Sequence, residues 1–186
     1  MKKYMDILSR CNLFEHIETE HISAMLNCLG AEVRSYRKNQ NIFTEGETAA
    51  HIGIMLSGTA QIVRVDFYGN RSIVTVLEPP QLFGESFACT ETQSIPVNVI
   101  AETDCEVMLI DSRKMLQPCS SACAFHSRII FNLMKEISAK NLLLNQKIEI
   151  ISKRSTAHES TDRGFCPAPE NSSSRYSSRK AGILPP

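Results

Sequence analysis

The sequence lacks the features that would place the chain in a membrane or outside the cell. No apolar run approaches the roughly 18 residues that a membrane-spanning helix needs. The first ten residues, MKKYMDILSR, carry charged and polar side chains where a signal peptide has a continuous apolar core. The seven cysteines are an odd number without framework spacing, which favours reduced thiols over disulfides. We therefore expect a cytoplasmic protein that makes no membrane contact.

Net charge and catalytic signatures are also absent. The 20 basic and 20 acidic residues cancel, so the whole molecule has no general attraction for nucleic acid or anionic lipid. No nucleophile elbow, Walker loop or HExxH motif occurs, and the five histidines are scattered. We expect no enzyme and no cofactor, which leaves the binding of an unknown small-molecule effector as the remaining chemistry.

The periodicity of apolar residues changes along the chain. Residues 1–30 have the one-face spacing of a helix, which Gly30 ends. Residues 31–111 carry short Val, Ile, Thr and Phe runs separated by turn residues. HIGIMLSGTAQIVRV predicts two strands around Ser57-Gly58, and VDFYGNRSIVTVL predicts a hairpin with its turn at Gly69-Asn70. This regular spacing of short strands is typical of a small antiparallel sandwich or barrel.

A helix over residues 120–154 carries a heptad pattern. Its seam follows spacings of 4, 3, 4, 3, 4 and 3 and consists of Ile130, Met134, Ile137, Asn141, Leu144, Ile148 and Ile151. An Asn at one a position favours a parallel dimer in fixed register, because two buried amides pair only when aligned. The alternative is one amphipathic helix packed on its own strands. Leu133, Leu142 and Leu143 lie off the seam and would face those strands.

The order of these parts resembles the sensor region of the Crp/Fnr transcription regulators. The pieces that carry the resemblance are NIFTEGE, GIMLSGTAQIVR, YGNRSIVTVLEPPQLFGES and CEVMLID, within roughly residues 5–154. The resemblance implies a mainly β fold with flanking helices: a double-stranded, jelly-roll-like β-roll of the cyclic-nucleotide-binding kind, followed by a dimerisation helix. Residues 1–119 would form the N-terminal helices and the sensor roll, and residues 120–154 the long helix.

In that family the phosphate-binding loop reads Gly-Glu, then Arg followed by Ser/Thr and Ala. The resemblance implies that the matching residues of this chain would form such a loop. Gly84 and Glu85 match, but the Arg position falls at Ile95 and the Ser/Thr position at Pro96. Between Arg71 and Arg113 there is no Lys, Arg or His. A buried phosphate without a partner charge is costly, so we expect no specific cyclic-nucleotide binding.

Two other interpretations of the loop remain open. Glu85 could cap a short helix that begins near Ser86, and Arg64 or Arg71 could swing in from the neighbouring hairpin. A pocket for another molecule would draw on Gly84, Glu85, Ser86, Ile95 and Pro96, with Ser138 and Asn141 of the long helix as a second wall.

Cysteines supply a different hypothesis. Cys119, Cys123 and His126 lie at i, i+4 and i+7, a spacing that predicts one helix face able to hold a soft metal or a reactive thiol. The alternative is that they are ordinary small buried residues.

Residues 155–186 have another composition. They are rich in Ser and Pro, without apolar periodicity, which predicts a disordered tail without a recognisable DNA-binding domain. A frameshifted or truncated regulator is one hypothesis, and a relic that only dimerises is another. We expect a homodimer, mixed dimers with intact paralogues, and DNA binding only for a full-length relative that carries the helix-turn-helix.

Overall fold

The computed structural model describes residues 2–90, 94–117 and 125–161. By their internal contacts the residues fall into two units, 1–144 and 145–186. The first unit holds both sheets and the short helices, and the long helix α5 (His126–Thr161) begins in it and continues into the second.

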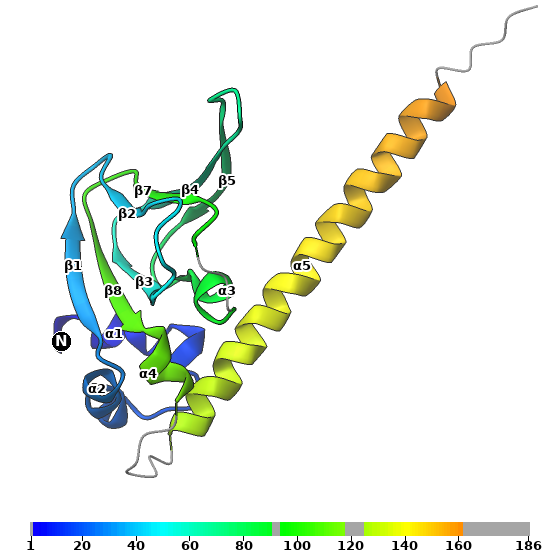
Figure 1. Ribbon diagram of the computed structural model, residues 1–186. Coiled ribbons are helices and arrows are strands. Elements are labelled where there is room, and N and C mark those ends of the chain that lie inside the picture. Colours follow the sequence, from blue (N-terminus) through cyan, green and yellow to red (C-terminus); the bar gives the residue numbers. More distant parts are fainter. Residues whose placement is uncertain (1, 91–93, 118–124, 162–186) are drawn as a thin grey trace, which may run out of the picture. The chain divides into compact units, whose positions relative to one another are not determined.

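Two four-stranded sheets form the β-roll of the first unit (Figure 1). One has the order β1 (Glu32–Tyr36), β8 (Cys105–Asp111), β3 (His51–Ser57) and β6 (Leu82–Phe83). The other has the order β2 (Asn41–Phe43), β7 (Asn98–Ala101), β4 (Ala60–Val65) and β5 (Arg71–Leu77). Every pairing among the described strands is antiparallel, so the predicted mainly β fold with two antiparallel layers is confirmed.

Strands β3 and β8 are buried on both faces, which divides the core into two clusters. Their alternate side chains point in opposite directions. Met55 and Val107 enter a cluster inside the roll, whereas Ile54 and Met108 join an outer cluster with the helices. This double burial explains why both strands are almost continuously apolar in sequence.

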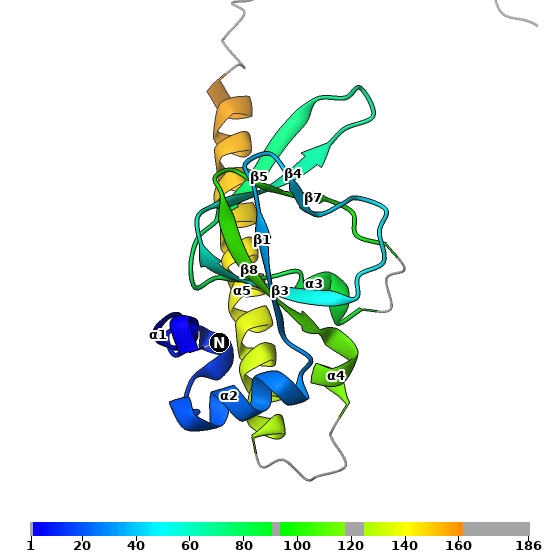
Figure 2. The same cartoon turned by 90° about the vertical axis from the view of Figure 1, so that its left-hand side faces the viewer.

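The short helices gather at one end of the roll with the start of α5 (Figures 1 and 2). They are η1 (Lys2–Tyr4), α1 (Met5–Leu8), η2 (Asn12–Phe14), α2 (Thr19–Cys28) and α4 (Ser112–Leu116). The buried face of α2 shares the outer core cluster with Ile129 and Leu133 of α5. The predicted helical segment 1–30 therefore consists of several short helices, and their apolar faces form part of the outer core cluster.

Turn residues behave largely as predicted. Asp66 to Asn70 form the β4–β5 turn, where Gly69 has φ 83°. Ser57-Gly58 does separate two strands, but β3 and β4 belong to different sheets, so the turn carries the chain from one sheet to the other. At Gly58 (φ 70°) a Cβ would lie 2.4 Å from the carbonyl oxygen of Asp104, so this crossing requires glycine.

Two expectations for the long helix differ from the structure. Leu133 is buried against the roll's outer core as expected, but Leu142 and Leu143 are 64% and 52% exposed and do not face it. The helix is described to Thr161 rather than ending at Arg154, because the residues that follow Arg154 include no Gly or Pro before Gly164.

Candidate effector site

The Gly-Glu loop turns sharply between β6 and α3 (Glu85–Ala88). Gly84 precedes the helix in the left-handed region, with φ 82°. A Cβ there would lie 2.7 Å from the ring of Phe43, so both conformation and space require glycine. The backbone conformation of Gly84 therefore fixes the direction in which the Glu85 side chain leaves the chain after β6.

Glu85 is a buried carboxylate paired with the long helix. Its side chain is 4% exposed, and its Oε1 accepts a hydrogen bond from Lys140 Nζ at 2.9 Å. The same ammonium donates to the carbonyl oxygen of Leu82 at 2.7 Å and lies 3.6 Å from Glu136 Oε1. Glu85 Oε2 is buried and accepts no hydrogen bond from the residues that the structure describes.

This pairing corrects the capping interpretation of Glu85. The helix begins at Glu85 itself, and no side chain makes its N-terminal cap hydrogen bond. The carboxylate turns toward Lys140 instead, because an ion pair offsets the desolvation of a buried charge better than exposed backbone N–H groups do. The cation that residues 72–112 lack is therefore supplied by the long helix.

Lys140 is a residue of the candidate site that the sequence interpretation missed. The expected second wall was Ser138 and Asn141, yet both are exposed, and Lys140 between them reaches the loop. A usable signal was present: Ile129, Leu133, Glu136 and Lys140 repeat at spacings of 4, 3 and 4 on one face. That face, together with Ile137 of the seam, packs on the roll.

Ile95 fills the position where the family resemblance placed an arginine. Its side chain is buried in the core inside the roll together with Phe43, Phe83 and Val97. Its backbone N donates to Glu47 O at 2.8 Å, and its carbonyl accepts from Gly46 N at 2.9 Å. The position is therefore apolar and firmly held.

The remaining loop candidates do not converge on Glu85. Ser86 and Pro96 are exposed. Arg64 and Arg71 are exposed on the β4–β5 hairpin, and the ion pair of Glu85 within the described residues is with Lys140. The structure thus brings Gly84, Glu85 and Ile95 together with the core and leaves Ser86, Pro96, Ser138 and Asn141 on the surface.

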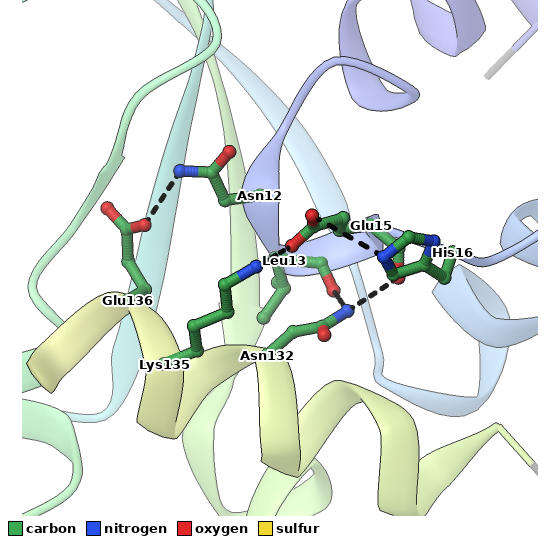
Figure 3. A network of polar contacts seen from close by, with 7 residues as sticks. All are labelled: Asn12, Leu13, Glu15, His16, Asn132, Lys135 and Glu136. Carbon is green, nitrogen blue, oxygen red and sulfur yellow. Dashed lines mark hydrogen bonds and ion pairs between the residues drawn. The ribbon is translucent and has the colours of Figure 1, made fainter. Parts of the chain in front are cut away.

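A polar clamp fastens the start of α5 to residues 12–15 (Figure 3). Asn132 Nδ2 donates to the carbonyls of Leu13 at 3.0 Å and Glu15 at 2.9 Å. Lys135 Nζ contacts Glu15 Oε2 at 2.6 Å, and this hydrogen bond lowers the pKa of the Glu15 carboxyl. Asn12 Nδ2 donates to Glu136 Oε2 at 2.8 Å. The clamp and Lys140 together fix α5 against the roll over residues 132–140.

Most of the predicted seam is exposed in the single chain. Met134, Leu144, Ile148 and Ile151 are 63%, 58%, 63% and 67% exposed, and Asn141 is exposed as well. Ile130 and Ile137 are half-buried, and Ile137 packs against the outer core of its own roll. The seam therefore lies beside the roll-facing side of the helix and shares Ile137 with it.

The cysteine hypothesis receives no support from the part of the chain described. Cys119 and Cys123 lie outside the described residues. His126 is buried with Nε2 2.7 Å from the carbonyl oxygen of Met115, a structural contact. Burial raises the pKa of the Cys11 thiol to about 11. Among described residues no three His, Cys, Asp or Glu side chains form a group that could hold a metal ion.

No helix within the described ranges has the length and apolarity needed to cross a bilayer. Residues 33–121 match the cyclic nucleotide-binding domain family. This match covers just under half of the chain, and the chain is also similar to a CRP-like transcription regulator.

Known proteins agree with this assignment. The CRP-like cAMP-activated global transcriptional regulator of Mycobacterium tuberculosis is 29% identical over 80 residues, which are 43% of this chain and 35% of that protein. The Thermus thermophilus catabolite activator protein aligns with a TM-score of 0.64 at 18% identity, over 76% of this chain and 63% of the other. The sensor domain of the regulator DNR from Pseudomonas aeruginosa gives 0.63 at 18% identity, over 80% and 93%. The chain thus matches about a third of the length of its curated relative.

Proposed function

We propose that this chain is the effector-sensing part of a Crp/Fnr-type transcription regulator. It acts in the cytoplasm without catalysing a reaction, dimerises through α5, and does not use a cyclic nucleotide as its effector. The observation that carries the proposal is that Lys140 pairs with Glu85, while Ile95, at the position where the resemblance places a phosphate-binding arginine, is buried in the apolar core.

The electrostatics of the loop argue against a cyclic nucleotide. A cyclic phosphate beside Ile95 would lose its hydration without gaining a cation, and a buried uncompensated charge is costly. Lys140 could supply a cation, but its ammonium already donates to the Glu85 carboxylate and to the carbonyl of Leu82. Its transfer to a phosphate would leave Glu85 buried and unpaired.

Isothermal titration with cyclic AMP and cyclic GMP at low salt tests this part of the proposal. We expect no specific heat of binding from this chain. The cAMP-activated mycobacterial regulator serves as the positive control in the same buffer. A dissociation constant in the low micromolar range, about −8 kcal/mol, would overturn the claim.

Dimerisation follows from the exposed seam of α5. Four apolar side chains at a and d positions are more than half exposed in the single chain. A parallel pairing of two helices would bury them, and aligned Asn141 side chains would fix the register. Movement of the two helices against each other would then carry a signal from the roll toward a DNA-reading segment of a full-length relative.

Sedimentation of the double variant Leu144→Asp/Ile148→Asp tests the dimer. These residues lie on the seam and outside the core of the roll, so the variant should fold and sediment as a monomer. Leu142→Asp/Ile150→Asp is the matched control, because both residues are similarly exposed but off the seam. A seam variant that stays dimeric, or a control that also dissociates, would remove the assignment.

Mixed dimers follow from the same surface. An intact paralogue with a matching seam would pair with this chain, and the mixed dimer would then carry fewer DNA-reading heads than the intact one. Co-expression with a tagged paralogue and measurement of the mixed species by mass would test this consequence.

A further inference from the structure

A small crevice lies where three parts of the first unit meet: the segment before η2, the turn before β6, and α5. Its volume is about 260 Å³, and it is lined by Arg10, Cys11, Asn12, Pro80, Gln81, Leu82 and Glu136. Drug-sized ligands occupy pockets of roughly 300–1,000 Å³, so this crevice suits a smaller metabolite. It is separate from the Gly84–Ile95 loop, because neither residue lines it.

Charges of both signs line the crevice, on different elements. The Arg10 guanidinium donates through Nε to the carbonyl of Asp6 at 3.3 Å, which uses one of its five N–H donors. Glu136 has a side chain that is 15% exposed. It accepts one hydrogen bond from Asn12, whose amide reaches it from η2 (Figure 3), and a carboxylate has about four acceptor positions. Both groups therefore retain hydrogen-bonding capacity.

The rest of the lining suits a short apolar body. Leu82 and Cys11 are 3% and 2% exposed, and Pro80 closes the turn beside them. Gln81 adds an amide whose Oε1 already accepts from Glu78 N at 2.9 Å. An apolar floor between a guanidinium and a carboxylate is complementary to a small molecule with an acid at one end and an amine at the other.

We propose that this crevice binds a small zwitterion, a free amino acid, with its carboxylate on Arg10 and its ammonium on Glu136. The proposal rests on the proposed sensing function, for which it names the effector class.

The crevice is connected to the sensor loop through Lys140. Glu136 lines the crevice and lies 3.6 Å from Lys140 Nζ, which holds Leu82 O and Glu85. An ammonium bound to the Glu136 carboxylate would weaken the ion pair between Glu136 and Lys140. Because coupling between two sites is reciprocal, replacement of Lys140 should in turn change the affinity for the ligand.

Thermal unfolding of the whole 186-residue chain with each of the 20 common amino acids at millimolar concentration is the first test. A ligand that binds the folded state alone raises Tm, so we expect one or a few amino acids to do so. The N-acetyl form of that amino acid, which lacks the ammonium, and its amide, which lacks the carboxylate, should not. The absence of any amino acid that raises Tm would overturn the proposal.

Titration of the active amino acid into variants locates the site. Arg10→Gln and Glu136→Gln should each weaken binding roughly tenfold or more, since each removes a charge-assisted hydrogen bond. Lys135→Gln is the matched control, because Lys135 pairs with Glu15 on the neighbouring part of α5 and does not line the crevice. Unchanged affinity in Arg10→Gln, an exposed residue whose loss should leave the fold intact, would also overturn the proposal.

These results are distinguishable from failure of the proposed function. If the chain is a monomer and binds an amino acid, the crevice proposal is supported and the dimer proposal is contradicted. If the chain is a dimer and binds no amino acid, the dimer proposal is supported and the crevice proposal is contradicted. Binding of cyclic AMP with unchanged affinity in Arg10→Gln would contradict the loop assignment alone.

Discussion

Replacement of Lys140 by methionine isolates the contact between the long helix and the roll. The change keeps the length of the aliphatic chain and removes the ammonium that Glu85 Oε1 and Leu82 O accept from. Loss of one partner of a fully buried pair costs about 3–5 kcal/mol. Lys140 is 38% exposed, so water reaches it, and we expect a smaller loss of about 2–3 kcal/mol.

Urea unfolding followed by circular dichroism measures this loss. The midpoint should fall by about 1 M at unchanged m, and Tm by roughly 4–12 °C. Lys135→Met is the matched control on the same helix, because its ion pair with Glu15 is between side chains 58% and 36% exposed. Such a surface pair contributes about 0–1 kcal/mol, so the control should differ little from the wild type.

A third variant separates the pair from the packing. Lys140→Met/Glu85→Leu replaces both charges by apolar groups, and buried ion pairs replaced in this way are often energetically neutral. It should therefore recover most of the stability lost in Lys140→Met. If Lys140→Met unfolds within about 0.5 kcal/mol of the wild type, or Lys135→Met is equally costly, the role assigned to the Lys140–Glu85 contact is refuted.

Four further outcomes are expected. Asn141→Ile should make the dimer more resistant to dilution and less uniform in stoichiometry, as analytical ultracentrifugation would detect. Asp66→Ala should accelerate amide exchange across the β4–β5 turn, where that carboxylate accepts from the backbone N of Tyr68 and Asn70 at 2.9 and 2.8 Å. The Asn70 side chain lowers the pKa of Asp66, so the wild-type turn should be protected above pH ~4 and lose protection as pH falls through the lower folded pKa. If Cys119 and Cys123 form a sensor, mild peroxide should change the stability or oligomeric state of the dimer and Cys123→Ser should abolish this change, whereas an identical response in wild type and variant would exclude them.

The elements with local signals were predictable from the sequence. The β4–β5 hairpin follows from Gly69-Asn70 between two β-rich runs, and the α2 face follows from its helical spacing. The inner and outer core faces of β3 could not be separated in the same way, because residues 52–56 contain no polar side chain and all are buried. The assignment of strands to sheets depends on long-range pairing, such as Val33 with Met108, which no short window contains.

Of the candidate site, only the backbone turn could be predicted from the sequence, and the side-chain contacts could not. Gly84 was correctly placed at a turn, since its positive φ and the nearby Phe43 ring leave no room for a side chain. The partner of Glu85 was missed because Lys140 lies 55 positions further along the chain and approaches through the packing of α5. The Asn132 contacts with Leu13 and Glu15 were missed for the same reason.

The burial of Ile95 has a consequence for how this domain can change over evolutionary time. The family resemblance places a phosphate-binding arginine at this position, whereas here the side chain is one of the apolar residues of the core inside the roll. Replacement of Ile95 by arginine would insert a guanidinium among Phe43, Phe83 and Val97 and would destabilise the fold. A gain of cyclic-nucleotide binding at this loop would therefore require several simultaneous changes, whereas adaptation toward other effectors would not have to alter this core position.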